Sequence, residues 1–326
     1  MRVRDNSLDA VCGLLIIYMI YGHICLWAGV EQVEIFPRLL FFFMPWFFFK
    51  SGMFYKPRPL KKELSGGARR LLVPYVAFSI IGQLVFYVKW LLDGNTSWKG
   101  YLLSPLRTLL HEGAVVGNSP LWFLLSLFLV KVIYDGVYSW SRKLAIVLTI
   151  LAGIIAYLLR MLEFHSYFYV ANVCCGIFFY GCGYLMKNIV YKKSVICVGG
   201  ILYAAYAIIY PSYFDFRSNA VAVAVYPFCM IACIAGILFV DALFKKGKCL
   251  QKPFVIVGKS SMSYYAVHWV VLGVSSLLFQ NVLDLKGYVL FVAFALANIV
   301  ALPSLAIFFN KHGRWMIGIS SENKKR

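Results

Sequence analysis

Two histidines in strongly apolar stretches are the residues best suited to chemistry. His23 lies fourteen residues after Asp9 in one apolar run, and His268 lies in another run near the far end of the chain. On a helix, fourteen residues return to a similar face after a rise of roughly 20 Å. An ionisable side chain in such a run must face protein or water, which makes His23 a functional candidate. A structural histidine bonded between helices is the alternative.

His268 belongs to a polar stripe on an otherwise apolar helix. Ser261, Tyr265 and His268 follow an i, i+4, i+7 spacing, which places them on one face. His268 lies fourteen residues after Phe254, near the start of its run, and His23 lies fourteen residues after Asp9. We therefore expect the two imidazoles at the same depth in the membrane. Two such imidazoles can form a general acid–base site. No third ligand is spaced to join them, so no metal site is predicted.

Other polar residues have simpler interpretations. Asn118 and Trp122 open an apolar segment, where a tryptophan commonly anchors a helix at the membrane interface. Lys131 and Asp135 have the i, i+4 spacing of a helical ion pair. Lys50 follows a run of aromatic residues and is expected to extend its amine to the interface.

The second apolar segment carries a proline in its middle. Pro45 lacks a backbone N–H, so it predicts a kink within a single helix. Such a kink can open a cavity beside the helix.

The composition requires that these residues lie in membrane helices. Hydrophobic residues make up 62% of the 326 positions and charged residues 14%, against about 25% charged in soluble domains. Soluble cytosolic and secreted enzymes are therefore excluded. Windows of about 20 apolar residues predict an all-α integral membrane protein with ten transmembrane helices. The predicted spans are 8–29, 36–55, 71–92, 119–140, 144–160, 168–188, 194–211, 219–241, 254–280 and 287–310.

The basic residues predict how these spans are oriented. The net charge is +19, and when loops are assigned alternately to two sides, 22 of the 32 Lys and Arg residues fall on one side and six on the other. Positive residues collect in cytoplasmic loops, so both termini are predicted to be cytoplasmic. This distribution also accounts for the charge without a nucleic-acid partner. The nine cysteines form no C-x-x-C pair, and residues 1–326 are interpreted as a single domain.

Five motifs, in order along most of the chain, carry a resemblance to a known family. They are Leu8, Asp9 and Gly13 leading to His23; Met44 to Gly52; Arg70 to Tyr75; Pro120 to Leu124; and Gly258 and Ser261 leading to His268. Together they resemble the membrane acyltransferase 3 family. The resemblance implies a ten-helix enzyme that O-acylates, usually O-acetylates, sugars of cell-surface polysaccharides with acyl-CoA as donor. It also implies that His23 is the principal catalytic residue.

The sequence departs from the family pattern at three places. Cys12 stands where the family usually has Arg or Lys, Phe43 stands where a histidine is often found, and an Arg-x-x-Arg motif is reduced to Arg69 and Arg70. A catalytically inactive family member is therefore one alternative. A transporter or flippase of lipid-linked sugars is another, although the hydropathy has no inverted repeat.

The leading hypothesis is an O-acyltransferase in a bacterial cytoplasmic membrane, with no bound cofactor and acyl-CoA as donor substrate. His23 is predicted to act as general base or to carry the acyl group, with help from Asp9, His268 and Ser261. The predicted substrate-binding residues are Trp122, Asn118, Tyr265, Arg69 and Arg70. The two arginines belong to a basic loop suited to the donor phosphates. The expected partners are acyl-CoA, membrane lipids and a surface glycan or its lipid-linked sugar precursor.

Overall fold

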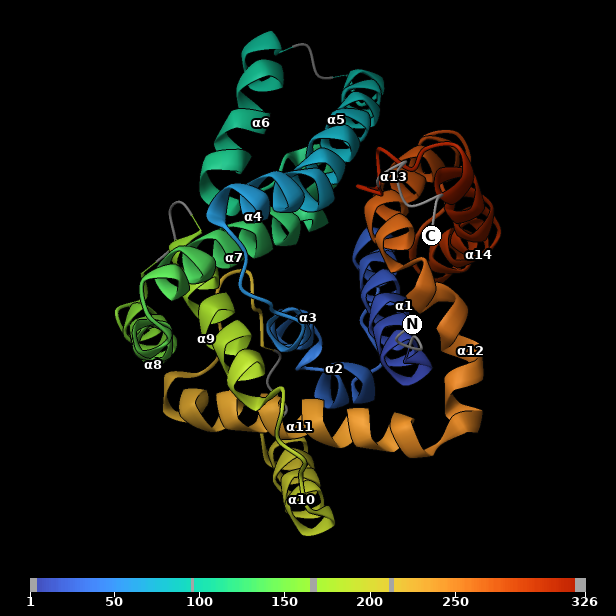
Figure 1. Cartoon of the computed structure of the whole chain (residues 1–326). Helices are drawn as coiled ribbons and strands as arrows, with labels where there is room; N and C mark the ends of the chain where they lie inside the picture. The colour runs from blue at the N-terminus through green and yellow to red at the C-terminus, as the bar shows by residue number, and fades with distance from the viewer. Residues whose placement is uncertain (1–4, 95–96, 165–168, 211–213, 320–326) are drawn as a thin grey trace. The chain divides into compact units, whose positions relative to one another are not determined.

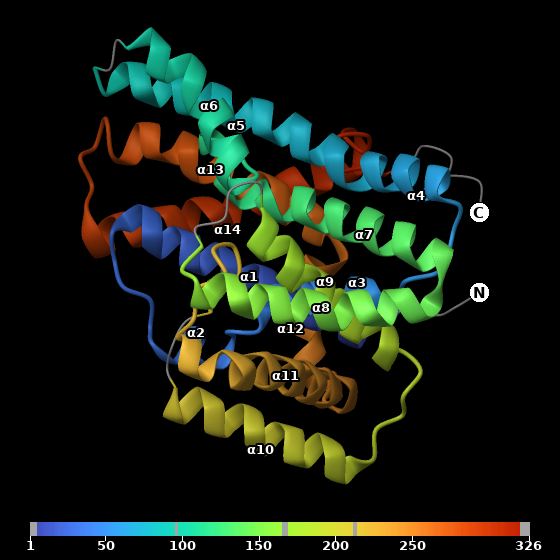
Figure 2. The same ribbon diagram turned by 90° about the vertical axis from the view of Figure 1, so that its left-hand side faces the viewer.

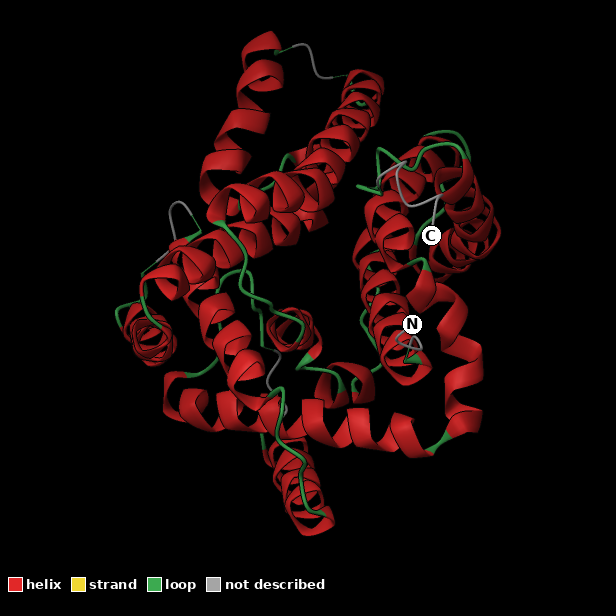
Figure 3. Ribbon diagram, viewed as in Figure 1, coloured by secondary structure: helices red, strands yellow, loops and turns green. Residues whose placement is uncertain are grey.

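The chain is helical throughout the part that the structure describes. This computed structural model describes residues 5–94, 97–164, 169–210 and 214–319. Within them, the β structure is limited to one isolated bridge between Asp215 and Ala220, and loops connect the helices (Figures 1 and 3). The basic chain ends that contribute to the predicted charge bias, Arg2, Arg4 and Lys324 to Arg326, lie outside the described residues.

Seven helices of the described chain are long and apolar enough to cross a membrane, and two shorter apolar helices accompany them. The seven are Asn6–Ala28, Leu60–Leu92, Leu102–Trp140, Arg142–Met161, Val223–Lys246, Ser261–Phe279 and Gly287–Lys311, and the shorter two are Val170–Met186 and Lys193–Ile209. Leu60–Leu92 and Leu102–Trp140 each join more than one helical element. Nine of the ten predicted spans overlap one of these helices. The protein is an all-helical integral membrane protein, as predicted.

The second predicted span is the exception. Residues 36–55 form two helices, α2 (Ile35–Leu39) and α3 (Phe43–Met53), instead of one kinked helix. The chain breaks before Pro45, which lies in the first turn of α3. Because the first N–H groups of a helix have no partner within it, a proline there removes no helical hydrogen bond. The predicted mid-helix kink is therefore wrong.

The tertiary contacts divide the chain into two compact units. The first unit contains residues 1–32, 68–125 and 250–326, and the second contains residues 33–67 and 126–249. In the first unit lie α1 (Asn6–Ala28), the π-helical turn η1 (Ala68–Leu72), α5 (Val73–Leu92), α6 (Trp98–Glu112), the 3-10 turn η2 (Val116–Leu121), most of α12 (Lys248–Lys259), α13 (Ser261–Phe279) and α14 (Gly287–Lys311). Here α13 packs against α5 and α14 (Figure 2).

The second unit is built around α3. Its other helices are α2, α4 (Leu60–Gly67), most of α7 (Trp122–Trp140), α8 (Arg142–Met161), α9 (Val170–Met186), α10 (Lys193–Ile209), the 3-10 turn η3 (Val223–Val225) and α11 (Tyr226–Lys246). Within it α9 packs against both α3 and α8, and α10 packs along α11 (Figure 2).

A glycine pair sets the closest helix contact of the first unit. A Cβ atom at Gly13 of α1 would lie 2.0 Å from the carbonyl oxygen of Phe254, and one at Gly258 of α12 would lie 1.6 Å from that of Asp9. The two backbones are therefore in direct contact, which in a membrane only small residues allow. Both glycines belong to the motifs singled out in the sequence, and their shared contact explains why the motifs require them.

Buried charges in the second unit find partners that the sequence did not reveal. Lys50 is 7% exposed and forms an ion pair with Asp241 of α11, which also accepts a 3.0 Å hydrogen bond from Trp46 Nε1. The prediction that Lys50 extends to the interface is therefore wrong. A buried cation is tolerated because a carboxylate lies within reach.

The predicted Lys131–Asp135 pair is also replaced by other contacts. Lys131 forms a 2.7 Å ion pair with Glu63 of α4, and Asp135 accepts a 2.5 Å hydrogen bond from the hydroxyl of Tyr55. Both carboxylates are buried, so each needs a donor. Glu63 of α4 takes Lys131 as its partner, and Asp135 takes Tyr55, which lies two residues after α3.

We expect that Gly258→Ala lowers the thermal unfolding midpoint of the purified protein. The added methyl meets backbone atoms that cannot rotate away, and overpacking of this kind costs about 1–3 kcal/mol. Gly136→Ala in α7 is the matched control, since its Cβ would meet nothing within 4 Å. Replacing a helical glycine in open space adds stability of about 0.5–1 kcal/mol. Equal midpoints for the two variants would contradict the glycine contact.

Candidate functional site

The structure brings the two candidate histidines into direct contact in the first unit. His23 Nδ1 lies 2.8 Å from His268 Nε2, and the rings stack at 5.1 Å between centroids with an interplanar angle of 9°. His268 is fully buried, whereas His23 is partly exposed. The helical arithmetic that expected the two imidazoles at one level is consistent with this contact.

The carbonyl of Tyr265 determines which ring nitrogens of the two histidines carry protons. His268 Nδ1 lies 2.8 Å from the carbonyl oxygen of Tyr265, which can only accept a hydrogen bond. In the neutral pair, Nδ1 of His268 therefore carries the proton and its Nε2 accepts from His23 Nδ1–H. The lone pair of His23 then lies on its Nε2. This chain of hydrogen bonds makes Nε2 of His23 the basic atom of the pair, and His268 its positioning residue.

One indole packs against the imidazole pair, and a second indole packs against the first. Trp269 meets the ring of His23 edge-on, with centroids 5.1 Å apart and an angle of 88°, and Trp27 meets Trp269 at 5.3 Å. Trp27 lies one helical turn after His23 on α1. These contacts restrict the rotation of the His23 ring, so its Nε2 is held in one direction.

Tyr265 orients the site through both its backbone and its side chain. Its carbonyl holds His268, and its buried hydroxyl donates a hydrogen bond to the carbonyl of Pro120 in η2. The ring also meets Phe123 edge-on at 5.9 Å. Tyr265 was predicted to bind substrate. In the structure it contacts His268 through its carbonyl and links α13 to η2 through its hydroxyl.

Asn118 connects three elements of the first unit. It is fully buried, and its side-chain amide donates hydrogen bonds of 3.2 Å to the carbonyls of Phe78 in α5 and Ala266 in α13. The neighbouring Gly117 N–H donates to Gln83 Oε1 at 3.2 Å. These bonds fix η2 between α5 and α13, so the position of Asn118 is explained by helix connection.

The remaining predicted site residues lie apart from the imidazole pair. Asp9 precedes His23 by fourteen residues on one helix, which is roughly 21 Å of rise. Ser261 is the first residue of α13, roughly 10 Å along the helix from His268. Trp122 is buried at the start of α7, with its ring edge-on to Phe123. The structure does not bring these three side chains to the two rings.

Arg69 and Arg70 lie just before α5. Both belong to the π-helical turn η1 and both side chains are exposed. The backbone of Gly318, whose φ is +72°, passes close to both arginines, since a Cβ there would lie 2.7 Å from Arg69 O and 2.7 Å from Arg70 Cα. Because both side chains are exposed, the two guanidinium groups can reach an anion outside the helices.

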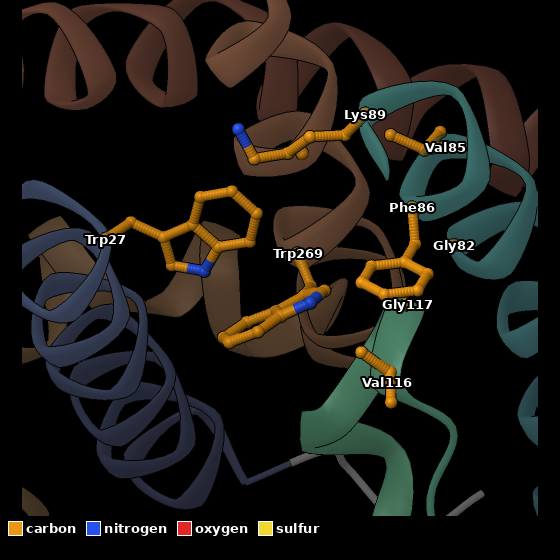
Figure 4. A pocket seen from close by; sticks show the side chains of 9 residues that line it. Trp27, Gly82, Val85, Phe86, Lys89, Val116, Gly117 and Trp269 are labelled. Atoms are coloured by element: carbon orange, nitrogen blue, oxygen red, sulfur yellow. The ribbon is translucent and has the colours of Figure 1, made fainter. Parts of the chain in front are cut away.

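Sequence reasoning missed a pocket next to the imidazole pair. It is lined by Trp27, Gly82, Val85, Phe86, Lys89, Val116, Gly117, Trp269 and Gly273. The side chains of Trp27, Trp269, Phe86 and Lys89 surround it (Figure 4). The available signal was that Trp27 follows His23 by one turn and Trp269 directly follows His268. Within the residues that the structure describes, no three His, Cys, Asp or Glu side chains gather closely enough to hold a metal ion.

Comparison with protein families assigns the chain. A family model described as an acyltransferase domain matches residues 5–308, which include both units and both histidines. The chain therefore belongs to the acyltransferase 3 family of membrane acyltransferases, and the predicted family is confirmed. Comparisons with curated proteins and with solved structures found no match.

We expect Asn118→Ala to destabilise the first unit. Each of the two lost hydrogen bonds contributes about 0.5–1.5 kcal/mol, so the free energy of unfolding should fall by about 1–3 kcal/mol. Asn310→Ala is the control, because its partly buried amide makes one 3.1 Å bond, to Ser260 Oγ. Thermal unfolding in detergent measures both. A larger loss in the Asn310 variant would contradict the connecting role of Asn118.

Proposed function

We propose that this protein transfers an acyl group, specifically an acetyl group, from acyl-CoA to a hydroxyl group of a cell-surface polysaccharide or its lipid-linked sugar precursor. The observation that carries the proposal is the hydrogen-bond chain from the Tyr265 carbonyl through His268 to His23. This chain presents a basic nitrogen at a fixed place in a protein of an acyltransferase family. We place the protein in a bacterial cytoplasmic membrane, with both termini on the cytoplasmic side.

His23 acts through its Nε2 in either of two routes. As general base, Nε2 takes the hydroxyl proton while the oxygen attacks the thioester carbonyl; the C–S bond breaks, and the proton passes to the departing thiolate to give free CoA. As nucleophile, Nε2 attacks the thioester carbonyl, the C–S bond breaks and the thiolate leaves. The hydroxyl oxygen then attacks the acyl group, the C–N bond to Nε2 breaks, and the hydroxyl proton passes to the thiolate to give free CoA. In both routes an imidazolium or acyl-imidazolium forms, and the acceptor nitrogen of His268 stabilises it through the Nδ1–H bond.

The donor approaches along α5 in this proposal. Arg69 and Arg70 are exposed in η1, directly before α5, where guanidinium groups can bind the CoA phosphates in a bidentate manner. The cation that the family usually has at the position of Cys12 is absent, so these arginines supply the positive charge.

Buried polar atoms continue from the arginines toward the histidine pair. Ser79 and Gln83 of α5 and Asn118 of η2 are each at most 8% exposed. Ser79 Oγ, Gln83 Nε2 and Asn118 Oδ1 have no hydrogen-bond partner within the described part of the chain. Ser79 and Gln83 lie roughly 14 and 20 Å along the helix from Arg70. Buried polar atoms require partners, so these three atoms mark the part of α5 and η2 whose hydrogen bonding is least satisfied within the described chain.

The direct test is the substitution His23→Gln. Loss of a general base costs about 10²–10⁴ in rate, so transfer of labelled acetate from acetyl-CoA to surface glycan in isolated membranes should fall to background. His312→Gln, which changes an exposed histidine at the end of α14, should keep the activity of the unmodified protein. Near-normal activity of a well-folded His23→Gln variant would assign this histidine to structure alone.

A second test addresses the donor. Arg70→Ala should raise the apparent KM for acetyl-CoA by about tenfold, because hydrogen bonds to charged groups contribute about 1.5–3 kcal/mol. Lys246→Ala removes an equally exposed cation at the end of α11 and should leave that KM unchanged. The same KM in both variants would show that the arginine turn does not hold the donor.

A further inference from the structure

Residues 313–319, which follow α14, form a compact and docked segment. They consist of turns, yet Ile317 is only 4% exposed. Three backbone hydrogen bonds close these turns, from Met316 N to Gly313 O at 2.9 Å, from Gly318 N to Trp315 O at 3.1 Å and from Ile319 N to Arg314 O at 2.8 Å. The end of a chain is well ordered only where it is tied down, so we looked for what this segment contacts.

The segment contacts η1, the π-helical turn that carries Arg69 and Arg70. A Cβ atom at Gly318 would lie 2.7 Å from Arg69 O, 2.7 Å from Arg70 Cα and 3.0 Å from Arg70 O. The φ of Gly318 is +72°, a conformation that glycine adopts without strain. Both the close approach and the conformation therefore require a glycine at this position.

The π-helical shape of η1 affects how its two arginines are presented. A π-helix is rare, occurs mostly as a single turn and is frequently found at functional sites. Its wider turn rotates successive residues by less than the roughly 100° of an α-helix, so Arg69 and Arg70 point more nearly in one direction. Relaxation to an α-helical turn would move the two guanidinium groups apart. The backbone of Gly318 lies against the carbonyl oxygens of both residues, where it can hold the wider turn.

The charges of the two contacting segments suit a phosphate group. Neither residues 64–72 nor residues 311–319 contain Asp or Glu, whereas they contain Arg69, Arg70, Lys311 and Arg314. The side chains of Arg69 and Arg70 are exposed and so can reach a ligand. Adjacent guanidinium groups with no carboxylate in either segment favour a phosphate, which each of them can bind through two hydrogen bonds.

We propose that residues 313–319 are a clasp that holds η1 in the π-helical shape in which Arg69 and Arg70 together bind a phosphate-bearing ligand. Gly318 is then a positioning residue, because it acts through the two arginines. CoA and anionic lipid headgroups offer the same phosphate chemistry. The choice of CoA rests on the proposed acyl transfer, whereas the clasp and its effect on phosphate binding do not.

The first experiment measures the clasp by hydrogen exchange of the protein in lipid nanodiscs. Gly318→Ala places a methyl against the backbone of η1. Gly287→Ala makes the same change at the start of α14, where φ is +56° and a Cβ would meet nothing within 4 Å. Both variants carry the strain of an alanine at positive φ, so they differ in the contact with η1. We expect the amides of residues 68–72 to exchange about tenfold faster in Gly318→Ala. Equal exchange in the two variants would overturn the clasp.

A second pair of variants keeps this test valid if Gly318→Ala fails to fold. Ile317→Ala removes a buried side chain from the clasp, and Ile307→Ala makes the same change on α14 at a position that is 60% exposed. The loss of buried apolar area loosens the clasp without placing an atom against η1. Faster exchange in residues 68–72 is expected for Ile317→Ala and not for Ile307→Ala, and the opposite order would contradict the clasp.

The second experiment measures whether the clasp determines phosphate affinity. Equilibrium binding of CoA is recorded in nanodiscs of neutral lipid and in nanodiscs that also contain an anionic phospholipid. We expect Gly318→Ala and Ile317→Ala to raise the dissociation constant for CoA in neutral nanodiscs by about tenfold and the two control variants to leave it unchanged.

The two lipid compositions distinguish the sources of the phosphate. If anionic lipid raises the thermal midpoint of the unmodified protein more than that of the clasp variants, and CoA does not bind, the clasp stands and its ligand is a lipid headgroup. If neither CoA binding nor the effect of anionic lipid differs between the clasp variants and their controls, the clasp has no role in phosphate binding and the proposal is wrong.

The kinetics separate this inference from the proposed reaction. In acetyl transfer, both clasp variants should raise the KM for acetyl-CoA by about tenfold and leave kcat unchanged, as expected for the loss of an interaction that holds donor and transition state equally. A lower kcat at an unchanged KM would assign Gly318 to structure alone. If CoA binding responds to the clasp and no variant transfers acetyl, the clasp stands and the proposed acyl transfer is wrong.

Discussion

The hydrogen bond from His268 Nδ1 to the carbonyl of Tyr265 is the interaction on which the proposed chemistry depends. An imidazole alone can carry its proton on either nitrogen. A carbonyl of the same helix removes that choice for His268 and, through the 2.8 Å contact, for His23. The backbone of α13 thus determines the reactive atom on α1.

The rest of the first unit serves to keep this contact in place. Direct backbone contact at Gly13 and Gly258 fixes α1 against α12, and Gly82 and Gly117 let η2 approach α5 in the same way. Asn118 then bonds η2 to both α5 and α13. Close backbone approach needs glycine, and in lipid it is stabilised by dispersion contacts and interhelical hydrogen bonds instead of water exclusion. The glycines and the asparagine together fix the position of His268 along α13 relative to His23 on α1.

Sequence reasoning succeeded where local geometry decides and failed where distant segments meet. The rise per residue of a helix is fixed, so counting along two helices was enough to expect His23 and His268 at one level. The same counting could not find Asp241 as the partner of Lys50, or Glu63 as that of Lys131, because these partners come from other helices. The pocket at Trp27 and Trp269 was missed for the same reason: four separate segments, α1, α5, η2 and α13, supply its wall. Pro45 was misread because its position relative to the start of α3 was unknown.

The protonation pattern of the histidine pair is the most direct test of this account. Nitrogen-15 NMR of the histidine-labelled protein in nanodiscs distinguishes protonated from bare ring nitrogens, and His23→Gln and His268→Gln assign the two rings. We expect both neutral histidines, His268 and His23, to carry the proton on Nδ1, so that Nε2 of each ring is unprotonated. A His23 ring that is protonated on Nε2 and unprotonated on Nδ1 would contradict the assignment of Nε2 as the reactive atom.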